Sequence, residues 1–242
     1  MQLTWLDNPT RLAEEAAHHV AALLAGKPTA ALALPTGNTP LGLYRQLVKM
    51  QERGEFSCDQ ASFFNLDEFV GKSLADEDSY ASFLWRHCFH PLAIRPDQVR
   101  LLQGDAGDLA AECRSFDQAI AAAGGLDLAI LGLGTNGHVA FNEPGSDWEA
   151  PTREVVLATA TKQAQQGLYA DETDVPPHGL TMGVATIRSA RSILLLVSGS
   201  NKAAAVAALL RGTPDEHWPV TAILDHPQLT VLADRKLQPQ HT

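Results

Sequence analysis

The sequence predicts an α/β fold: a single domain over residues 1–242, with a mainly parallel sheet and helices on both faces, like a modified Rossmann fold. Short apolar runs recur along the chain, followed by loops rich in glycine or threonine and, in several cases, by helical patterns. Runs such as LAILGL and ILLLV lack polar alternation, as expected of strands buried on both faces. No internal repeat or second-domain boundary interrupts the 242 residues.

The elements follow in order. Residues 8–26 carry apolar positions at helical spacing, with Asn8 or Thr10 as the start and Gly26 as the stop. A buried strand follows from residue 29 and ends at Pro35. Further helices are expected at 41–54 and 201–212, and further strands at 61–69, 126–134, 153–159, 192–200 and 229–234.

One segment departs from this alternation. Residues 147–180 are more polar, carry Pro176 and Pro177, and contain one strand-like run but no clear core helix. This segment is either a lid-like excursion from the sheet or an ordinary surface loop.

The composition excludes several classes. The formal charge is −10 without a Lys/Arg cluster, so no nucleic-acid partner is expected, although backbone N–H groups can still bind a small anion. Cys58, Cys88 and Cys113 form no C-x-x-C pair, which predicts reduced, structural thiols. The first 20 residues lack the apolar region of a signal peptide, and no apolar run is long enough to span a membrane. A cytoplasmic protein is expected.

In open α/β sheets, ligands bind beyond the carboxyl ends of the strands, so the loops there are the candidate site. The first of them, Thr36, Gly37, Asn38 and Thr39, joins a strand to a helix and offers free N–H groups at the positive end of a helix dipole. This is a good anion cradle. Alternatively, Thr39 only caps the helix and Pro40 is its first residue.

The second loop carries adjacent carboxylates, Asp67 and Glu68, after the apolar pair Phe63 and Phe64. A carboxylate shielded by apolar walls has a raised pKa and can act as a proton-abstracting base. The alternative is a capping Asp and a solvated Glu.

The third loop, LGLGTNGHVAFNEPGS, begins with the G-x-G-x-x-G pattern of dinucleotide sites. That pattern must open a long helix and be followed, about 20 residues later, by an acidic residue at the end of the next strand. Here Pro144 and Gly145 interrupt any helix, and the next strand ends in Thr159. The glycines are better interpreted as a tight bend beside a ligand.

His138 is the informative residue of this loop. It follows a strand end in a glycine-rich bend, and Glu143 lies five residues further on. An imidazole can accept and return a proton near neutral pH when Glu143 or Asn136 fixes its tautomer. The spacing is not H-E-x-x-H, so no metal site is expected.

Together these loops resemble the glucosamine-6-phosphate deaminase (isomerase) family. The resemblance lies in the order and spacing of LPTGNTPLGLY, FFNLDEFVG, LDLAILGLGTNGHVAFNEPGS and LTMGVATI, and it covers nearly the whole chain. The related 6-phosphogluconolactonases share the first loop and a glycine-histidine loop, but generally not the NLDE and FNEPG elements.

The resemblance implies an enzyme that converts glucosamine 6-phosphate to fructose 6-phosphate and ammonia, a hydrolase of C–N bonds in amino sugar catabolism. The loop at residues 36–39 would bind the 6-phosphate. His138, oriented by Glu143, would assist ring opening, and Asp67 would move the C2 proton to C1. Neither metal nor organic cofactor is implied.

The chain departs from the family at two places. Some members have Asp where this chain has Asn136, so the charge partner of His138 here would be Glu143. The lid Arg and Lys that contact the phosphate in other members align with Gly167 and Pro177. Lys162, His178 or Lys202 could substitute, and Lys202 in GSNKA resembles a family lysine.

Several functions therefore stay open. A galactosamine-6-phosphate deaminase differs only at C4 of the substrate, and a 6-phosphogluconolactonase-type hydrolase needs His138 but no C2 base. A sugar-phosphate sensor would have kept the fold without activity. The sequence is compatible with a monomer or a small homo-oligomer, and it lacks the C-terminal tail that helps form the allosteric site in longer members.

Overall fold

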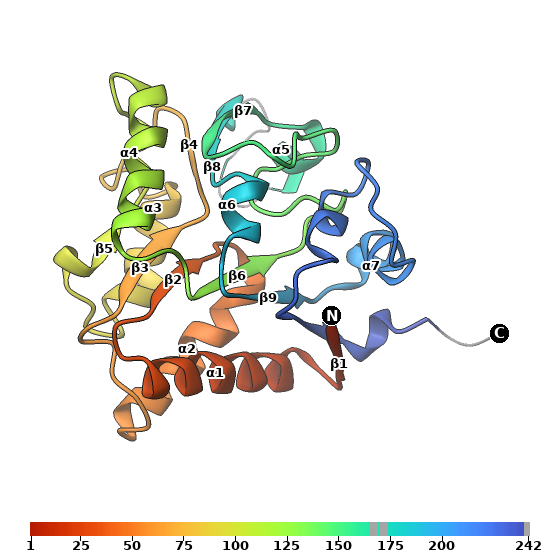
Figure 1. The fold of residues 1–242 in the computed structure, drawn as a ribbon, viewed down its shortest axis with the longest axis horizontal. Coiled ribbons are helices and arrows are strands. Elements are labelled where there is room, and N and C mark those ends of the chain that lie inside the picture. The colour runs from red at the N-terminus through yellow and green to blue at the C-terminus, as the bar shows by residue number, and fades with distance from the viewer. Residues whose placement is uncertain (165–168, 170–173, 240–242) are drawn as a thin grey trace.

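The computed structural model describes residues 1–164, 169 and 174–239. Seven strands form a parallel sheet in the order β1-β10-β9-β6-β2-β3-β5, which crosses the centre of the molecule (Figure 1). Their bounds are β1 Gln2–Leu6, β2 Ala31–Leu34, β3 Ser62–Asn65, β5 Val99–Arg100, β6 Leu128–Gly132, β9 Ser192–Val197 and β10 Leu229–Asp234. The α/β prediction with a mainly parallel sheet is confirmed.

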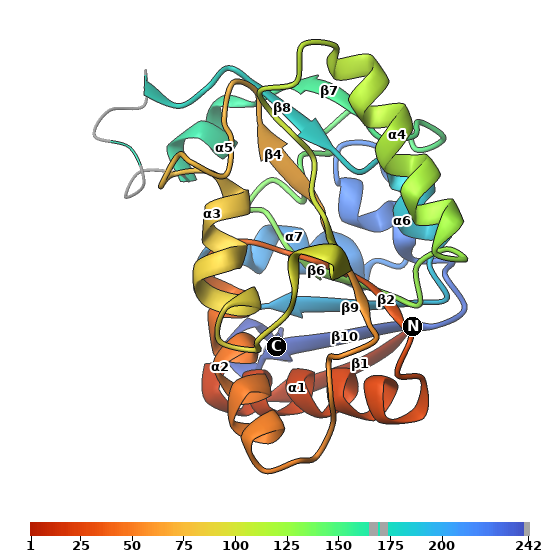
Figure 2. The same ribbon diagram turned by 90° about the vertical axis from the view of Figure 1, so that its left-hand side faces the viewer.

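Helices cover both faces of this sheet. Figure 2 shows α1 (Pro9–Gly26) and α2 (Asn38–Glu52) on one face, and α4 (Leu109–Ala122) and α6 (Val184–Arg188) on the other. Further helices are α3 (Tyr80–Leu84), which continues into a π-helical turn at Trp85–Phe89, α5 (Thr159–Ala164) and α7 (Ala203–Leu210). Among the helices that the structure describes, none has the length and apolar character needed to cross a membrane.

The strands contribute side chains to two separate cores, because successive side chains along a strand point to opposite faces of the sheet. In β2, Leu32 and Leu34 pack into the core beneath α1 and α2, whereas Ala31 and Ala33 pack into the core that contains Phe116 of α4. All four β2 residues are buried. A continuous apolar run is therefore what this position in the sheet requires.

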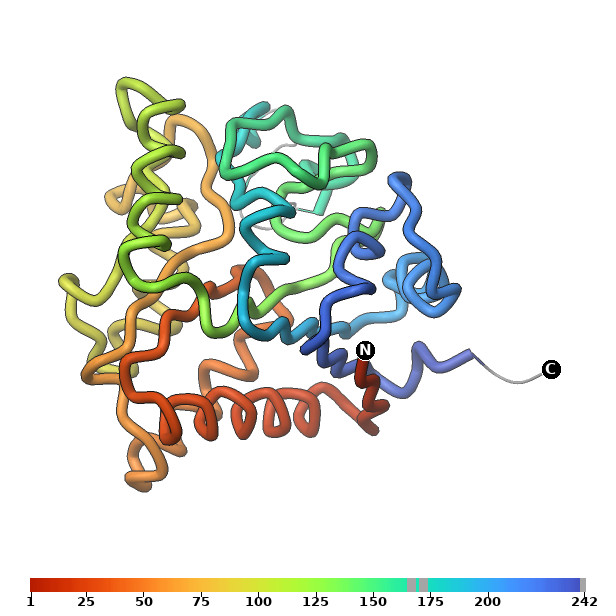
Figure 3. Tube along the Cα trace, in the orientation of Figure 1, coloured from red at the N-terminus to blue at the C-terminus, as the bar shows by residue number. Residues whose placement is uncertain are grey.

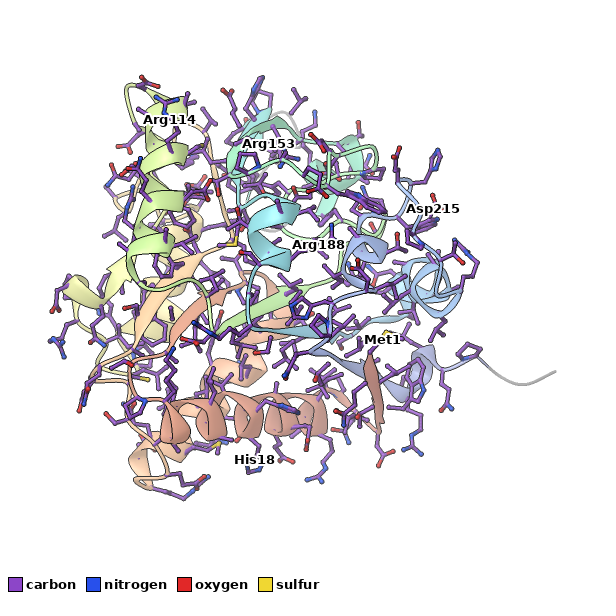
Figure 4. The ribbon with its side chains drawn as sticks, viewed as in Figure 1. Met1, His18, Arg114, Arg153, Arg188 and Asp215 are labelled. Carbon is purple, nitrogen blue, oxygen red and sulfur yellow. The ribbon has the colours of Figure 1, made fainter. Side chains whose placement is uncertain are left out.

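Helix α1 follows its sequence signals closely. The Asn8 side chain accepts a hydrogen bond from Arg11 N at 3.0 Å and so caps the helix, which ends at Gly26 as expected. Its apolar positions face the sheet, and His18 lies on the outer side of the helix, where it is exposed (Figure 4). The start at Asn8 and the stop at Gly26 are confirmed.

Helix α2 begins earlier than expected. Its first residue is Asn38, directly after Gly37, whose φ of 92° is a left-handed value that favours glycine. Thr39 and Pro40 therefore lie inside the first turn, and the alternative in which Thr39 caps the helix before Pro40 is wrong. The helix places its free N–H groups directly beside the loop.

Residues 61–69 were expected as one strand but form two, in different sheets. β3 ends at Asn65, and β4 (Asp67–Phe69) pairs with β8 (His178–Thr181) in a small antiparallel sheet that β7 (Arg153–Val156) completes. Leu66 lies at the break, and its carbonyl accepts a hydrogen bond from Met182 N at 2.7 Å. The break is invisible in the hydrophobic pattern because Leu66 is as buried as the strands on either side.

The excursion of residues 147–180 thus contributes two strands to a second sheet layer. Its helix, α5 (Thr159–Ala164), has six residues and lies beside β7 and β8, on the α6 side of the main sheet (Figures 1 and 3). A small separate core joins this segment to β4 and α3, and its buried members are Phe69, Tyr80, Phe141, Leu157 and Val175. A movement of this segment as a lid stays a prediction.

The strand order reverses between β2 and β6. From β2 the chain proceeds outward through β3 to β5, and from β6 it proceeds in the other direction through β9 to β10. The loops after β2 and β6 therefore diverge and leave a crevice at their carboxyl ends, which is where open α/β sheets bind ligands.

Candidate active site

A cavity of about 560 Å³ occupies this crevice. It is lined by the loops that follow β2, β3, β6 and β9, and by α5 from the excursion. Among the expected site residues, those that line it are Thr36, Gly37, Asn38, Thr39, Asp67, His138 and Lys202. Glu143 and Asn136 lie behind His138 and contact it or each other.

The loop after β2 forms one end of the cavity. Thr36 precedes the left-handed Gly37, and the first turn of α2 follows without an acidic residue. The Tyr44 hydroxyl on α2 donates a hydrogen bond to Pro35 O at 2.5 Å, which fastens the loop to its own helix. Unpaired N–H groups at a helix N-terminus, with the positive end of its dipole, are suited to bind an anion.

Lys202 lines the same cavity from the segment that follows β9. It is half-buried, burial lowers the pKa of its ammonium group, and among the residues that the structure describes no carboxylate forms an ion pair with it. A desolvated cation without a counter-ion is suited to an anionic ligand.

The other suggested cations do not line the cavity. His178 forms an ion pair with Glu154 at 2.7 Å, and Lys162 is not among the cavity residues. Pro177 is exposed, and its carbonyl accepts a hydrogen bond from Leu157 N at 2.9 Å. Gly167 lies outside the described residues.

Asp67 lies in the cavity wall at the start of β4 and is 7% exposed. The buried side chain of Asn65 fixes the turn before it, because its Nδ2 donates to Asp67 O at 2.8 Å and its Oδ1 accepts from Leu102 N at 2.9 Å. Burial, with the neighbouring Glu68 as the next cause, raises the pKa of Asp67 well above its usual range. The raised pKa makes this carboxylate a stronger base than a solvated aspartate, as a proton-abstracting group requires.

Glu68 points away from the cavity and has a structural function. It is fully buried and accepts hydrogen bonds from the backbone N–H groups of Phe69, Tyr80 and Ala81, at 2.8, 3.0 and 2.7 Å, so it satisfies the first two N–H groups of α3. Burial raises its pKa to about 7, although these three donors oppose the rise. The alternative with a capping Asp and a solvated Glu is therefore wrong, because the helix α3 is capped by Ser79 with support from Glu68, and both carboxyls are buried.

Glycines shape the loop after β6. A Cβ atom at Gly134 would lie 2.4 Å from the His138 ring, and Gly137 has a left-handed φ of 83°. Residues 133–152 contain no helix, and the chain turns back through a bridge between Val139 and Asn142. The long helix of a dinucleotide site is absent from this stretch, and the glycines form a bend that brings His138 to the cavity.

Glu143 and His138 are adjacent at the back of the cavity. The Nδ1 atom of His138 lies 3.5 Å from Glu143 Oε2, and the same oxygen accepts a hydrogen bond from Asn136 Nδ2 at 2.8 Å. The Asn136 Oδ1 atom accepts from His138 N at 3.2 Å. Burial raises the pKa of Glu143, but its contacts with His138, Thr161 and Asn136 outweigh burial and hold it below the usual value. Glu143 is therefore ionised at neutral pH.

Two further residues of this site have no sequence signal of their own. Thr161 lies on α5, is 1% exposed, and contacts both His138 and Glu143. Tyr80 lies on α3 and forms part of the cavity wall. Both belong to short helices outside the recognised motifs, and their positions depend on contacts between distant segments.

The other candidate chemistry is absent from the described part of the chain. Cys58, Cys88 and Cys113 are buried and unpaired, and no cluster of three or more His, Cys, Asp or Glu side chains among the described residues could hold a metal ion.

The chain is similar to known proteins over almost its entire length. Residues 7–232 match the family of glucosamine-6-phosphate isomerases and 6-phosphogluconolactonase. The chain is 43% identical to a glucosamine-6-phosphate deaminase of Porphyromonas gingivalis, over 89% of this chain and 82% of the relative. It is 42% identical to that of Bacillus velezensis, over 93% of each.

Solved structures show the same similarity. A monomeric glucosamine-6-phosphate deaminase superposes with a TM-score of 0.96 at 38% identity, covering 98% of each chain. A 6-phosphogluconolactonase of Thermotoga maritima has a TM-score of 0.76 at 21% identity, covering 96% of this chain and 98% of its own, and shares the fold. The chain belongs to the glucosamine-6-phosphate isomerase/6-phosphogluconolactonase family.

Proposed function

We propose that this protein is an isomerising deaminase that converts glucosamine 6-phosphate and water to fructose 6-phosphate and ammonia. The observation that carries the proposal is one cavity that joins an anion cradle, a buried carboxyl at Asp67 and the His138–Glu143 pair. The deaminases of Porphyromonas gingivalis and Bacillus velezensis, at 43% and 42% identity, support the same reaction.

The phosphate fixes the substrate in the cavity. The N–H groups and hydroxyls of residues 36–39 and the ammonium of Lys202 bind it at one end, and the sugar extends toward Asp67 and His138. Binding energy at the phosphate then positions C1 and C2, which do not themselves touch the cradle.

Two proton transfers carry the reaction. His138 relays the proton that opens the sugar ring to the aldehyde, with its imidazolium form stabilised by Glu143. Asp67 removes the proton from C2 to give an enolamine and returns it to C1, so that C2 becomes an imine. Water adds to this imine and ammonia leaves, which breaks the C–N bond and makes the net reaction a hydrolysis.

The carboxyl in the cavity wall is what separates this reaction from lactone hydrolysis. Ester hydrolysis needs a base for water, for which His138 suffices, and it has no use for a second base at C2. Asp67 is buried and holds a raised pKa, as proton abstraction beside a carbonyl requires.

The test is a panel of substrates with two readouts. Glucosamine 6-phosphate should release ammonia and fructose 6-phosphate in equal amounts, whereas galactosamine 6-phosphate should react more slowly. Turnover of 6-phosphogluconolactone without ammonia release from either amino sugar would establish a hydrolase of the lactonase type. Binding of the amino sugar phosphates without turnover would establish a sensor.

A substitution of Lys202 tests whether the phosphate of the substrate binds at this lysine. Lys202→Met should raise KM for glucosamine 6-phosphate about tenfold or more and change kcat less, because it removes a contact to a group that does not react. Lys49→Met, at an exposed position near the end of α2, is the matched control. An unchanged KM in Lys202→Met would remove this lysine from the phosphate site.

The solved deaminase with a TM-score of 0.96 is monomeric, which supports a monomer here. Light scattering during size-exclusion chromatography should give the mass of one chain, 26.0 kDa. Cytoplasmic location and the lack of a nucleic-acid partner stay predictions from the sequence.

A further inference from the structure

Thr161 connects the excursion to the catalytic pair. Its side chain is buried on α5, at the edge of the cavity, and its hydroxyl lies between two groups. The Oγ1 atom lies 3.2 Å from His138 Nδ1 and forms a short hydrogen bond with Glu143 Oε1. One hydroxyl therefore contacts both members of the pair.

The single hydroxyl proton decides how these contacts are arranged. An ionised carboxylate only accepts hydrogen bonds, so Thr161 must donate its proton to Glu143. The contact with His138 is then possible only if the Nδ1 atom carries the hydrogen and Thr161 accepts it. In neutral His138 this leaves Nε2, the ring nitrogen that neither Thr161 nor Glu143 contacts, as the basic nitrogen.

The two oxygens of Glu143 are held from different parts of the fold. Oε2 faces Asn136 and His138, both in the loop after β6. Oε1 faces Thr161 and the backbone N–H of Ala158, which lies at 3.3 Å and also belongs to the excursion. Without the excursion, one oxygen of this buried carboxylate would lose both of these donors.

We propose that Thr161 is a positioning residue that fixes the His138 tautomer and the ionised form of Glu143 for the deaminase reaction. The proposal rests on the proposed function. As a consequence, Glu143 and His138 act together with the neutral hydroxyl of Thr161 as a triad. Asn136 contributes a hydrogen bond to the pair but cannot bear a charge.

The test compares two variants of Thr161. Thr161→Val keeps the shape but removes the hydroxyl, and it should lower kcat about tenfold while KM for glucosamine 6-phosphate stays within about twofold. Because Glu143 loses a donor, the acidic limb of the pH profile of kcat/KM should move up by about half to one pH unit. Thr161→Ser keeps the hydroxyl and should restore both values.

Thr159→Val is the control, because it makes the same change at an exposed position of the same helix and should leave kcat and the pH profile unchanged. The proposal fails if Thr161→Val has the kcat and acidic limb of the unmodified enzyme. It also fails if Thr161→Ser is as impaired as Thr161→Val, since packing rather than the hydroxyl would then be responsible.

A second measurement does not depend on turnover. Long-range ¹H–¹⁵N correlation spectra of the imidazole groups distinguish the two neutral tautomers, and His138 should carry its proton on Nδ1. A proton on Nε2 would overturn the proposal even in an active enzyme. If the unmodified protein releases no ammonia but His138 has the Nδ1–H form and loses it in Thr161→Val, the proposed function fails and the positioning by Thr161 stands.

Discussion

Two buried aspartates, Asp127 and Asp67, lie at opposite ends of the parallel sheet in opposite environments. Asp127 precedes β6 at the amino ends of the strands, where Lys27 Nζ contacts it at 2.7 Å and Arg191 at 2.8 Å. Ala31 N, at the start of β2, donates to it at 2.9 Å. Hydrogen bonds and positive charges hold its pKa below the usual value despite the opposing effect of burial.

Asp67, at the carboxyl ends of the strands, is buried beside another carboxyl, and its pKa is raised. This difference shows that one fold can use a buried aspartate either for stability or for proton transfer, depending on its surroundings. Asp127, with its cations and N–H donors, connects the starts of neighbouring strands and stabilises the fold. Asp67 has no cation or donor that offsets its burial, so it can carry a proton but lowers the stability of the fold.

The largest expected effect is on activity at the carboxyl end. Asp67→Asn keeps the shape but removes the base, so kcat should fall on the order of 10³-fold or more. Thermal stability should be unchanged or slightly higher at neutral pH, because an uncompensated buried carboxyl is removed. Deaminase assays and calorimetry on the same preparation measure both. An active variant would contradict the function given to Asp67.

The converse change at the amino end should affect stability alone. Asp127→Ala removes the partner of the buried Ala31 N–H, and it should lower the free energy of unfolding by about 3 kcal/mol. The kcat should stay within about twofold, because the full length of β6 separates Asp127 from the cavity loop. Urea unfolding and steady-state kinetics check the two halves of this prediction, and a large loss of kcat would break the comparison.

The fold was largely predictable because hydrophobic periodicity and strand-loop-helix order are local signals. The edge strand β1 was missed because its residues are only partly buried and form no continuous apolar run. The separation of β3 from β4 was missed because it depends on pairing with β8, more than 100 residues further along the chain.

The site was predictable to a similar extent. Asp67 and His138 follow the ends of strands, and loops at the carboxyl ends of parallel strands meet at the same edge of the sheet, where ligands bind. Thr161 could not be predicted, because its contacts to Glu143 and His138 span 18 and 23 residues and arise from how the excursion folds back. The ion pair of Lys27 with Asp127 spans 100 residues and was equally invisible.

The pH dependence of stability should separate the two ends. The pKa of Asp127 is lower in the folded state than in the unfolded state. Asp127 therefore stabilises the fold at pH values above its pKa in the unfolded state, and this contribution is lost as the pH falls through its pKa in the folded state. The raised values at Asp67 and Glu68 act in the opposite direction, so stability falls as the pH rises above their unfolded values.

Glu68 alone, with a pKa raised from 4.5 to about 7, should lower the free energy of unfolding by about 2 kcal/mol between about pH 5 and pH 7.5. Urea unfolding from about pH 3 to about pH 7.5 measures this fall and the acidic side of the profile. Asp67→Asn should reduce it, whereas Asp127→Ala should flatten only the acidic side, below about pH 4. If the free energy of unfolding changed with pH in the same way in the unmodified protein, Asp67→Asn and Asp127→Ala, these carboxyls would not control the pH dependence of stability.

The smallest effects are expected at the cations around Asp127. Lys27 and Arg191 have side chains that are 43% and 60% exposed, so water solvates each of them once its partner contact is lost. Arg191→Met should cost about 0.5 kcal/mol, and Lys27→Met, which loses contacts to both carboxylate oxygens, about 1 kcal/mol. A double-mutant cycle measured by urea unfolding should give a combined loss smaller than that of Asp127→Ala, because the Ala31 N–H keeps its acceptor in both variants. A combined loss as large as that of Asp127→Ala would mean that charge, and not the buried hydrogen bond, stabilises this end of the sheet.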